Sequence, residues 1–124
     1  MITPVTTSLL EPAELARRII DALSDRQAED VVLLDISQVS SFADFFVIAT
    51  AQNGRHMNAL IDAFEKELAT EGTKALRREG DSNSGWVLVD LGPVIVHLFT
   101  DEDRDFYNLE GLWTRVGVPA VRFQ

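Results

Sequence analysis

Residues 79–99 read EGDSNSGWVLVDLGPVIVHLF and contain two apolar runs joined by Gly92-Pro93. A two-residue turn at this pair predicts an antiparallel hairpin in which Leu91 lies opposite Val94. Successive side chains of each strand then point to opposite faces. One face carries the polar and aromatic side chains: Trp86, Leu88, Asp90, Ile95, His97 and Phe99. The other face is aliphatic and suited to packing on helices: Val87, Val89, Leu91, Val94, Val96 and Leu98. A longer loop over residues 90–94 would shift or flip one strand, so this register depends on the turn.

Apolar patterns elsewhere in the chain alternate between helical and extended spacing. Residues 12–23 have a helical stripe that begins at Pro12, and residues 54–71 have another that follows Asn53 as a candidate cap. Residues 30–37 and 44–51 are continuous apolar runs, typical of strands covered on both faces, and their short connection allows them to pair. A short extended segment is expected around residues 75–78.

A last helix is expected after Thr100, because a Thr cap followed by acidic residues 101–103 suits the positive end of a helix dipole. Phe106, Leu109 and Trp113 recur on one side of this segment, and Gly111 indicates a short or interrupted helix. Phe106 and Trp113 are at least as suited to filling the core as to contacting a partner. Trp86, at the start of a strand behind a glycine loop, is the better anchor for a partner.

These elements predict a single α/β domain with a mixed sheet flanked by helices. Residues 1–10 are expected to form a flexible N-terminal arm, residues 11–115 the domain, and residues 116–124 a tail that is either strand-like or loose.

The composition limits the possible functions. The chain has 124 residues, of which 46% are hydrophobic, and 20 acidic against 11 basic residues give a formal net charge of -9. This charge repels nucleic acid, so a basic protein is the better partner and broad nucleic-acid binding is not expected. The absence of cysteine excludes disulfides, thiolate zinc sites and thiol nucleophiles. No segment approaches the roughly 18 uninterrupted apolar residues of a membrane span, so we expect a cytoplasmic protein without membrane contact.

Asp90 and His97 could form a catalytic base and its orienting group. Nucleophilic catalysis also needs a Ser or Cys directed at the His, and no motif supplies one. His56 and His97, the two histidines, fall on different predicted elements without the spacing of metal ligands, so no metal and no cofactor is expected. A structural or interface role is therefore favoured for this pair.

An enzyme acting on nucleotides is the alternative function. Asp35 and Asp44, on or beside strands, would suit the paired carboxylates with which nucleotidyltransferases hold Mg²⁺. However, the Gly-Ser turn, the paired acidic motif and the phosphate-binding loop are all missing. The acidic residues 101–105 are better explained as a capped and solvated helix start.

Four motifs occur in order between Leu15 and Trp113: DFFVIATA, GRHMNALIDAFEKEL, the hairpin sequence quoted above, and RDFYNLEGLW. Together they resemble the ribosomal silencing factor family, also called Iojap. The resemblance implies a nucleotidyltransferase-like topology without transferase motifs or enzyme activity. It also implies binding to the L-fourteen-type protein of the large ribosomal subunit, which would block joining of the small subunit and repress translation under nutrient limitation. A homodimer is implied for the free protein.

The same resemblance assigns the contact and support surface to ten positions of this chain. The implied partner-binding residues are Glu79, Gly80, Trp86, Leu88, Asp90, His97, Tyr107, Leu109, Glu110 and Trp113.

Overall fold

The computed structural model describes residues 10–123, so nearly all of the predicted arm, residues 1–10, lies outside the described residues. The elements in chain order are α1 (Pro12–Asp25), β1 (Glu29–Asp35), β2 (Phe45–Ala51), α2 (Gly54–Ala69), β3 (Arg77–Glu79), β4 (Trp86–Asp90), β5 (Val94–Thr100), α3 (Asp101–Tyr107), α4 (Leu109–Thr114) and β6 (Ala120–Arg122). The strands form one sheet in the order β3-β4-β5-β2-β1-β6. β2 and β5 run parallel, and the other neighbouring strands are antiparallel. The predicted mixed α/β sheet is confirmed.

The hairpin of β4 and β5 has the predicted register. The backbone N–H of Leu91 donates to the carbonyl oxygen of Val94 over 2.9 Å and closes the two-residue turn. Three cross-strand pairs carry the side chains of the polar and aromatic face: Trp86 with Phe99, Leu88 with His97, and Asp90 with Ile95. The shorter of the two possible turns therefore forms.

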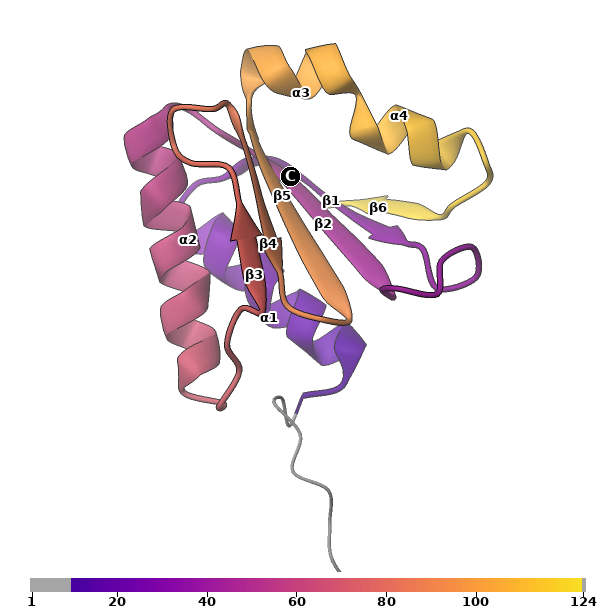
Figure 1. Cartoon of the computed structure of the whole chain (residues 1–124), viewed down its shortest axis with the longest axis horizontal. Helices are drawn as coiled ribbons and strands as arrows, with labels where there is room; N and C mark the ends of the chain where they lie inside the picture. Colours follow the sequence, from indigo (N-terminus) through magenta and orange to yellow (C-terminus); the bar gives the residue numbers. More distant parts are fainter. Residues whose placement is uncertain (1–9, 124) are drawn as a thin grey trace, which may run out of the picture.

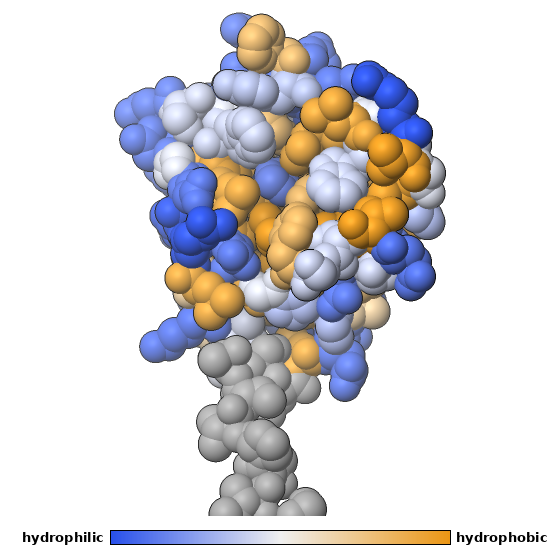
Figure 2. Space-filling view, turned by 45° about the vertical axis from the view of Figure 1, so that its right-hand side comes forward, coloured by the Kyte–Doolittle hydropathy of each residue, from blue (hydrophilic) through white to orange (hydrophobic). Residues whose placement is uncertain are grey.

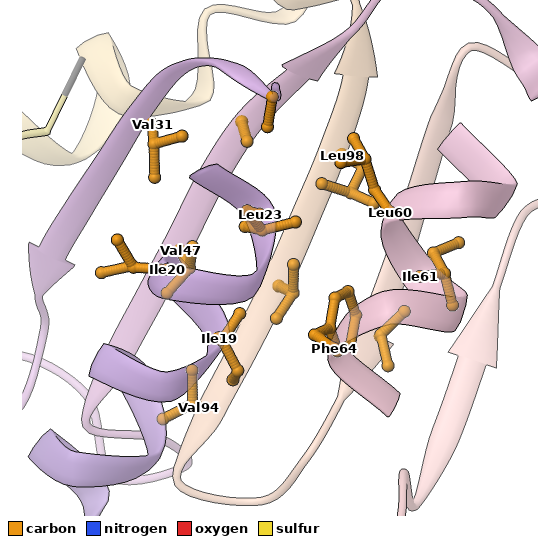
Figure 3. Packing of buried hydrophobic residues seen from close by; sticks show 14 of the residues in the cluster. Ile19, Ile20, Leu23, Val31, Val47, Leu60, Ile61, Phe64, Val94 and Leu98 are labelled. Atoms are coloured by element: carbon orange, nitrogen blue, oxygen red, sulfur yellow. The ribbon is translucent and has the colours of Figure 1, made fainter. Parts of the chain in front are cut away.

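The aliphatic face of the hairpin packs beneath α1 and α2, which cover one side of the sheet (Figure 1). The predicted stripes of both helices are buried here, and Figure 3 shows Ile19, Leu23 and Phe64 directed toward strand residues such as Val94 and Leu98. Asn53 caps α2 as predicted, because its side-chain oxygen accepts from the backbone N–H of His56 over 2.8 Å. This layer is the larger core of the domain.

A second, smaller core lies on the opposite side of the sheet, below α3 and α4. It consists of strand residues such as Phe46, Ile95 and Phe99, with Leu109 and Trp113 packed against them from α4. β1 contributes to both cores, so it is covered on both faces as predicted. The molecule therefore has three layers, with α1 and α2 on one side, the sheet in the middle, and α3 and α4 on the other.

The last helical segment differs from the prediction. Asn108 adopts a left-handed backbone conformation, with φ of 45°, and divides the segment into α3 and α4. Phe106 therefore leaves the face that Leu109 and Trp113 share, and 79% of its surface is exposed. Thr100 occupies the cap position of α3 but makes no capping hydrogen bond through its side chain. Gly111, at which the sequence suggested an interruption, lies within α4. The helical segment is instead interrupted at Asn108, three residues earlier.

Part of the predicted tail is an edge strand. Ala120–Arg122 pairs antiparallel with β1, so the strand-like alternative is the observed one. No helix in the described part of the chain combines the length and the apolar character needed to cross a membrane.

Candidate protein-binding surface

Six rings meet on the sheet face that α3 and α4 partly cover. We call this group the aromatic cluster, and it consists of Phe46, Trp86, His97, Phe99, Tyr107 and Trp113. Trp86 is stacked on Phe99 with 4.9 Å between ring centroids. The centroid of the Tyr107 ring lies 4.7 Å from that of Trp86. Residues of β5 and α3 therefore hold the indole of this β4 residue in place.

The hydrogen bond between Trp86 and His97 fixes the tautomer of the neutral imidazole. The Trp86 Nε1–H donates to His97 Nδ1 over 3.2 Å. Because Nδ1 is the acceptor, a neutral ring carries its proton on Nε2. Burial lowers the pKa of His97 from 6.5 to about 4, so the ring is neutral at ordinary pH. His97 Nε2 is buried and has no hydrogen-bond partner among the described residues.

The rim of the aromatic cluster is accessible from outside. Trp86 and Leu88 are only half-buried, and with Glu79 and Gly80 they line a pocket of about 260 Å³. Tyr107, which borders Trp86, is 44% exposed. Figure 2 turns the α4 side of the molecule toward the reader and shows apolar surface there, bordered by hydrophilic side chains. A partly open aromatic pocket with a polar rim has the composition of a protein-binding site.

Gly80 allows the approach of β3 to the start of β4. Its φ is +85°, and a Cβ atom there would lie 2.3 Å from the carbonyl oxygen of Trp86. Any other residue would push the main chain of Trp86 away. Gly80 therefore shapes the pocket through the backbone and not through a side chain.

Arg104 is a residue that the sequence analysis did not select. Its side chain is buried, and Nε and Nη2 donate to the two carboxylate oxygens of Glu110 over 2.8 and 3.1 Å. Its Nη1 donates to the carbonyl oxygen of Asp30 and to the Thr50 hydroxyl. Arg104 therefore attaches α3 and α4 to the sheet. The sequence offered one indication of this role: Arg104 is the first residue of the RDFYNLEGLW motif, four positions before Asn108.

Three of the side chains considered for catalysis, His97, Asp90 and Asp35, make hydrogen bonds to neighbouring groups and not to each other. His97 bonds to Trp86, whereas Asp90 Oδ1 accepts from the backbone N–H of Gly92 in the turn. Asp35 Oδ1 accepts from both the backbone N–H and the hydroxyl of Ser37. Within residues 10–123, no group of three His, Asp or Glu side chains is placed to hold a metal ion. Each of these polar groups has a local structural role.

The sequence profile described as "Ribosomal silencing factor during starvation" matches residues 10–123 of this chain. The chain belongs to the ribosomal silencing factor family. It is 38% identical to the ribosomal silencing factor RsfS of Halalkalibacterium halodurans over 100 residues, which cover 81% of this chain and 86% of that protein. It is 28% identical to a mouse protein, "Mitochondrial assembly of ribosomal large subunit protein 1", over 77% of this chain and 43% of the mouse protein. A crystal structure of a Chromobacterium violaceum protein is similar, with a TM-score of 0.80, 33% identity, and coverage of 85% of this chain and 88% of that chain.

In this member of the silencing factor family, the ten predicted positions fall into three places. The open pocket is lined by four of them: Glu79, Gly80, Trp86 and Leu88. Tyr107 stands exposed beside it. Of the other five, His97 is buried, Leu109 and Trp113 are partly buried against the smaller core, Glu110 pairs with Arg104, and Asp90 bonds to the hairpin turn. The sequence motif therefore contains side chains that can touch a partner and side chains that hold those in place.

Proposed function

We propose that this protein binds the L-fourteen-type protein of the large ribosomal subunit through the pocket at Trp86 and the exposed ring of Tyr107. While it is bound, its bulk at the subunit interface keeps the small subunit from joining, and translation falls when nutrients are limited. No catalytic step is part of this function. Its place of action is the cytoplasm, where the ribosomes are.

The observation that carries the proposal is the setting of Trp86. The indole is stacked, hydrogen-bonded and bordered by Tyr107, yet it remains partly exposed to solvent. A rigid, partly exposed Trp loses little conformational entropy when a partner covers it, and Trp is the side chain most enriched among the energetically dominant residues of interfaces. Membership of the ribosomal silencing factor family supports the ribosome as the partner.

The net charge supports a basic partner. A formal charge of -9 attracts proteins that carry excess Lys and Arg, which ribosomal proteins need in order to neutralise RNA phosphates. Complementary charge raises the rate of encounter and disfavours wrong partners.

Sedimentation with purified large subunits tests the proposal. We expect the wild-type chain to sediment with them, and Trp86→Ala and Tyr107→Ala each to weaken binding by about tenfold or more. Phe123→Ala is the matched control, because this partly exposed aromatic follows β6 at the other edge of the sheet. Folding is checked for each variant by circular dichroism. Wild-type binding by both folded pocket variants would remove this surface from the interface.

The occlusion step has its own measurement. Large subunits saturated with the protein are mixed with small subunits, and the fraction of joined ribosomes is read from sucrose gradients. We expect joining to fall with the wild-type chain and to be restored with Trp86→Ala. Binding without any loss of joining would contradict the occlusion step while leaving the partner assignment intact.

We further propose that the free protein is a homodimer and that residues 11–115 form the silencing-factor domain, with residues 116–124 as a tail. Light scattering of the free chain is expected to give twice the mass of one 124-residue chain. A monomeric mass at all concentrations tested would contradict the dimer.

A further inference from the structure

A second hollow lies at the other end of β4 from Trp86, beside the hairpin turn. It has a volume of about 320 Å³, and its walls come from the loop before β2, the segment before β3 and the turn itself. We call it the turn groove, and the lining residues that matter here are Phe42, Asp44, Leu76, Asp90, Gly92 and Pro93. Of its lining residues, Asp90 alone belongs to the ten implied partner-binding positions.

Two large apolar side chains that line the turn groove are exposed to solvent. Phe42 is 61% exposed and Leu76 is 62% exposed, although they come from segments more than thirty positions apart in the sequence. Scattered exposed apolar residues are ordinary on protein surfaces. Two that line one hollow can instead be covered together by a single incoming segment, which removes both from water.

The groove is already formed in the free chain. The backbone N–H groups of Asp44 and Phe45 donate to the carbonyl oxygen of Pro93 over 2.8 and 3.1 Å. On the opposite wall, Leu76 N–H donates to the Asp90 carbonyl oxygen over 2.8 Å. A partner that docks on walls fixed in this way does not have to order them, so less of the binding free energy is lost.

The turn groove continues the surface that carries Trp86. Trp86, Leu88 and Asp90 alternate along β4 and therefore point to the same face, the first two in the aromatic pocket and the third in the groove. Four residue steps of a strand separate the two hollows by about 13 Å. Phe42 is also linked to the aromatic cluster, since its ring centroid lies 6.3 Å from that of Phe46. One partner surface can cover both hollows at once.

The charges of the groove indicate the chemistry of its occupant. Asp44 and Asp90 belong to its lining, and the carboxylate of Asp90 pairs with Arg77 at 3.8 Å. Arg77 is also paired with Glu79, at 2.6 Å, so carboxylates are in excess along this face. An apolar segment that carries Lys or Arg complements both the exposed rings and this charge.

We propose that the turn groove is a second part of the docking face and receives an apolar, basic segment of the same ribosomal protein that covers Trp86. The identity of this partner rests on the proposed function, whereas the location and chemistry of the groove do not. Binding of the partner therefore depends on two separate regions of β4, and the groove selects for basic and apolar side chains in the partner.

The test measures the affinity of the full chain for the purified L-fourteen-type protein. In the variant Phe42→Ser with Leu76→Ser, we expect the dissociation constant to rise by about tenfold or more. Both side chains are exposed, so the thermal unfolding of this variant should match that of the wild-type chain. A second variant, Phe42→Leu with Leu76→Phe, keeps the apolar surface and should bind within about threefold of the wild type.

The matched control carries Val116→Ser and Val121→Ser, two exposed apolar residues after α4 and in β6, and should bind like the wild type. Asp44→Lys tests the charge, and we expect slower association than in the wild type. Faster association would mean that the incoming segment is acidic and would overturn the assigned chemistry.

Trp86→Ala, measured in parallel, separates this inference from the proposed function. If Trp86→Ala weakens binding and the groove variant does not, the second contact is overturned and the proposed function stands. If the groove variant weakens binding and Trp86→Ala does not, the groove stands and the aromatic pocket is no longer the contact. Unchanged binding in both variants overturns both proposals.

Discussion

Trp86 and His97 depend on each other through a single hydrogen bond. The indole N–H needs an acceptor because it is partly removed from water, and His97 Nδ1 supplies it only while the imidazole is neutral. Burial keeps the imidazole neutral by lowering its pKa. A histidine that could have been a catalytic base is therefore a hydrogen-bond acceptor that orients a partly exposed tryptophan.

This arrangement predicts a pH-dependent stability. Burial lowers the pKa of His97 from 6.5 to about 4, so the unfolded chain binds more protons than the folded chain between these values. The free energy of unfolding should therefore be highest above the unfolded pKa and fall by roughly 3 kcal/mol as the pH drops through this window.

Urea unfolding at a series of pH values measures the effect. Carboxylates also titrate in this range, so the comparison is with His97→Phe, which keeps an aromatic ring and removes the titration. We expect a smaller loss of stability on acidification in the variant. Identical pH dependence in both chains would show that His97 does not titrate with a lowered pKa.

Gly80 and Gly72 provide a matched pair for the geometry of the pocket. Both have left-handed backbone conformations, with φ of +85° and +76°, but a Cβ atom at Gly72 would meet nothing within 4 Å. Gly72→Ala should therefore cost only the backbone strain, about 1 to 2 kcal/mol of unfolding free energy. Gly80→Ala should cost more and should also weaken partner binding, because the Trp86 carbonyl must move. Equal costs in urea unfolding would contradict the close approach.

At the scale of elements, α3 and α4 are held on the sheet by one buried cation. The guanidinium of Arg104 bonds to Glu110 in α4, to Thr50 in β2 and to the Asp30 carbonyl in β1. Asp30 has a positive φ of 49° beside an irregularity in the β1–β2 pairing, and this bend turns its carbonyl toward the guanidinium. Three elements thus meet at one side chain.

Removal of this cation is expected to be costly. Arg104→Met leaves the partly buried carboxylate of Glu110 with only the longer contact to Arg122, at 3.4 Å, and removes the bonds to Thr50 and Asp30. The free energy of unfolding should fall by about 3 to 5 kcal/mol. Arg17→Met is the control, because Arg17 makes its ion pairs with Glu14 and Asp21 in solvent and should have little effect. Thermal or urea unfolding compares the two variants. A similar small effect in both would mean that Arg104 does not hold the α3–α4 corner.

The same elements separate what sequence could predict from what it could not. The register of β4 and β5 was predictable because alternation and a short Gly92-Pro93 turn are local features. The break at Asn108 was missed because a left-handed Asn leaves no periodic signal until the contacts of α4 are known. The role of Arg104 was missed because two of its partners lie more than fifty positions away in the chain.

The ten predicted site positions were also only partly predictable from the sequence. The motif includes the side chains that line the pocket, but it could not distinguish a partly exposed Trp86 from a buried His97, since both occupy the same face of one hairpin. Exposure depends on where α3 and α4 lie, and that depends on the contacts of Arg104.

At the scale of the whole molecule, the formal charge of -9 should act on the rate of association. Attraction to a basic partner is screened by salt, with a range of about 8 Å at physiological ionic strength. We expect the association rate constant for the L-fourteen-type protein to fall as NaCl is raised, with a smaller change in the dissociation rate constant. Stopped-flow measurements using tryptophan fluorescence give both rate constants. A rate constant that is independent of salt would argue against a basic partner.

The sheet order also bears on how this protein is made. β1 forms near the start of the chain, yet one of its two neighbours is β6, and the register pairs Leu34 with Ala120 and Val32 with Arg122. During synthesis, β1 therefore presents an open edge of Val and Leu residues until residues 120–122 have emerged. Open apolar edges are templates for wrong pairing. A nascent chain stopped before β6 should thus be prone to aggregation, so correct folding of the sheet depends on translation through residues 120–122.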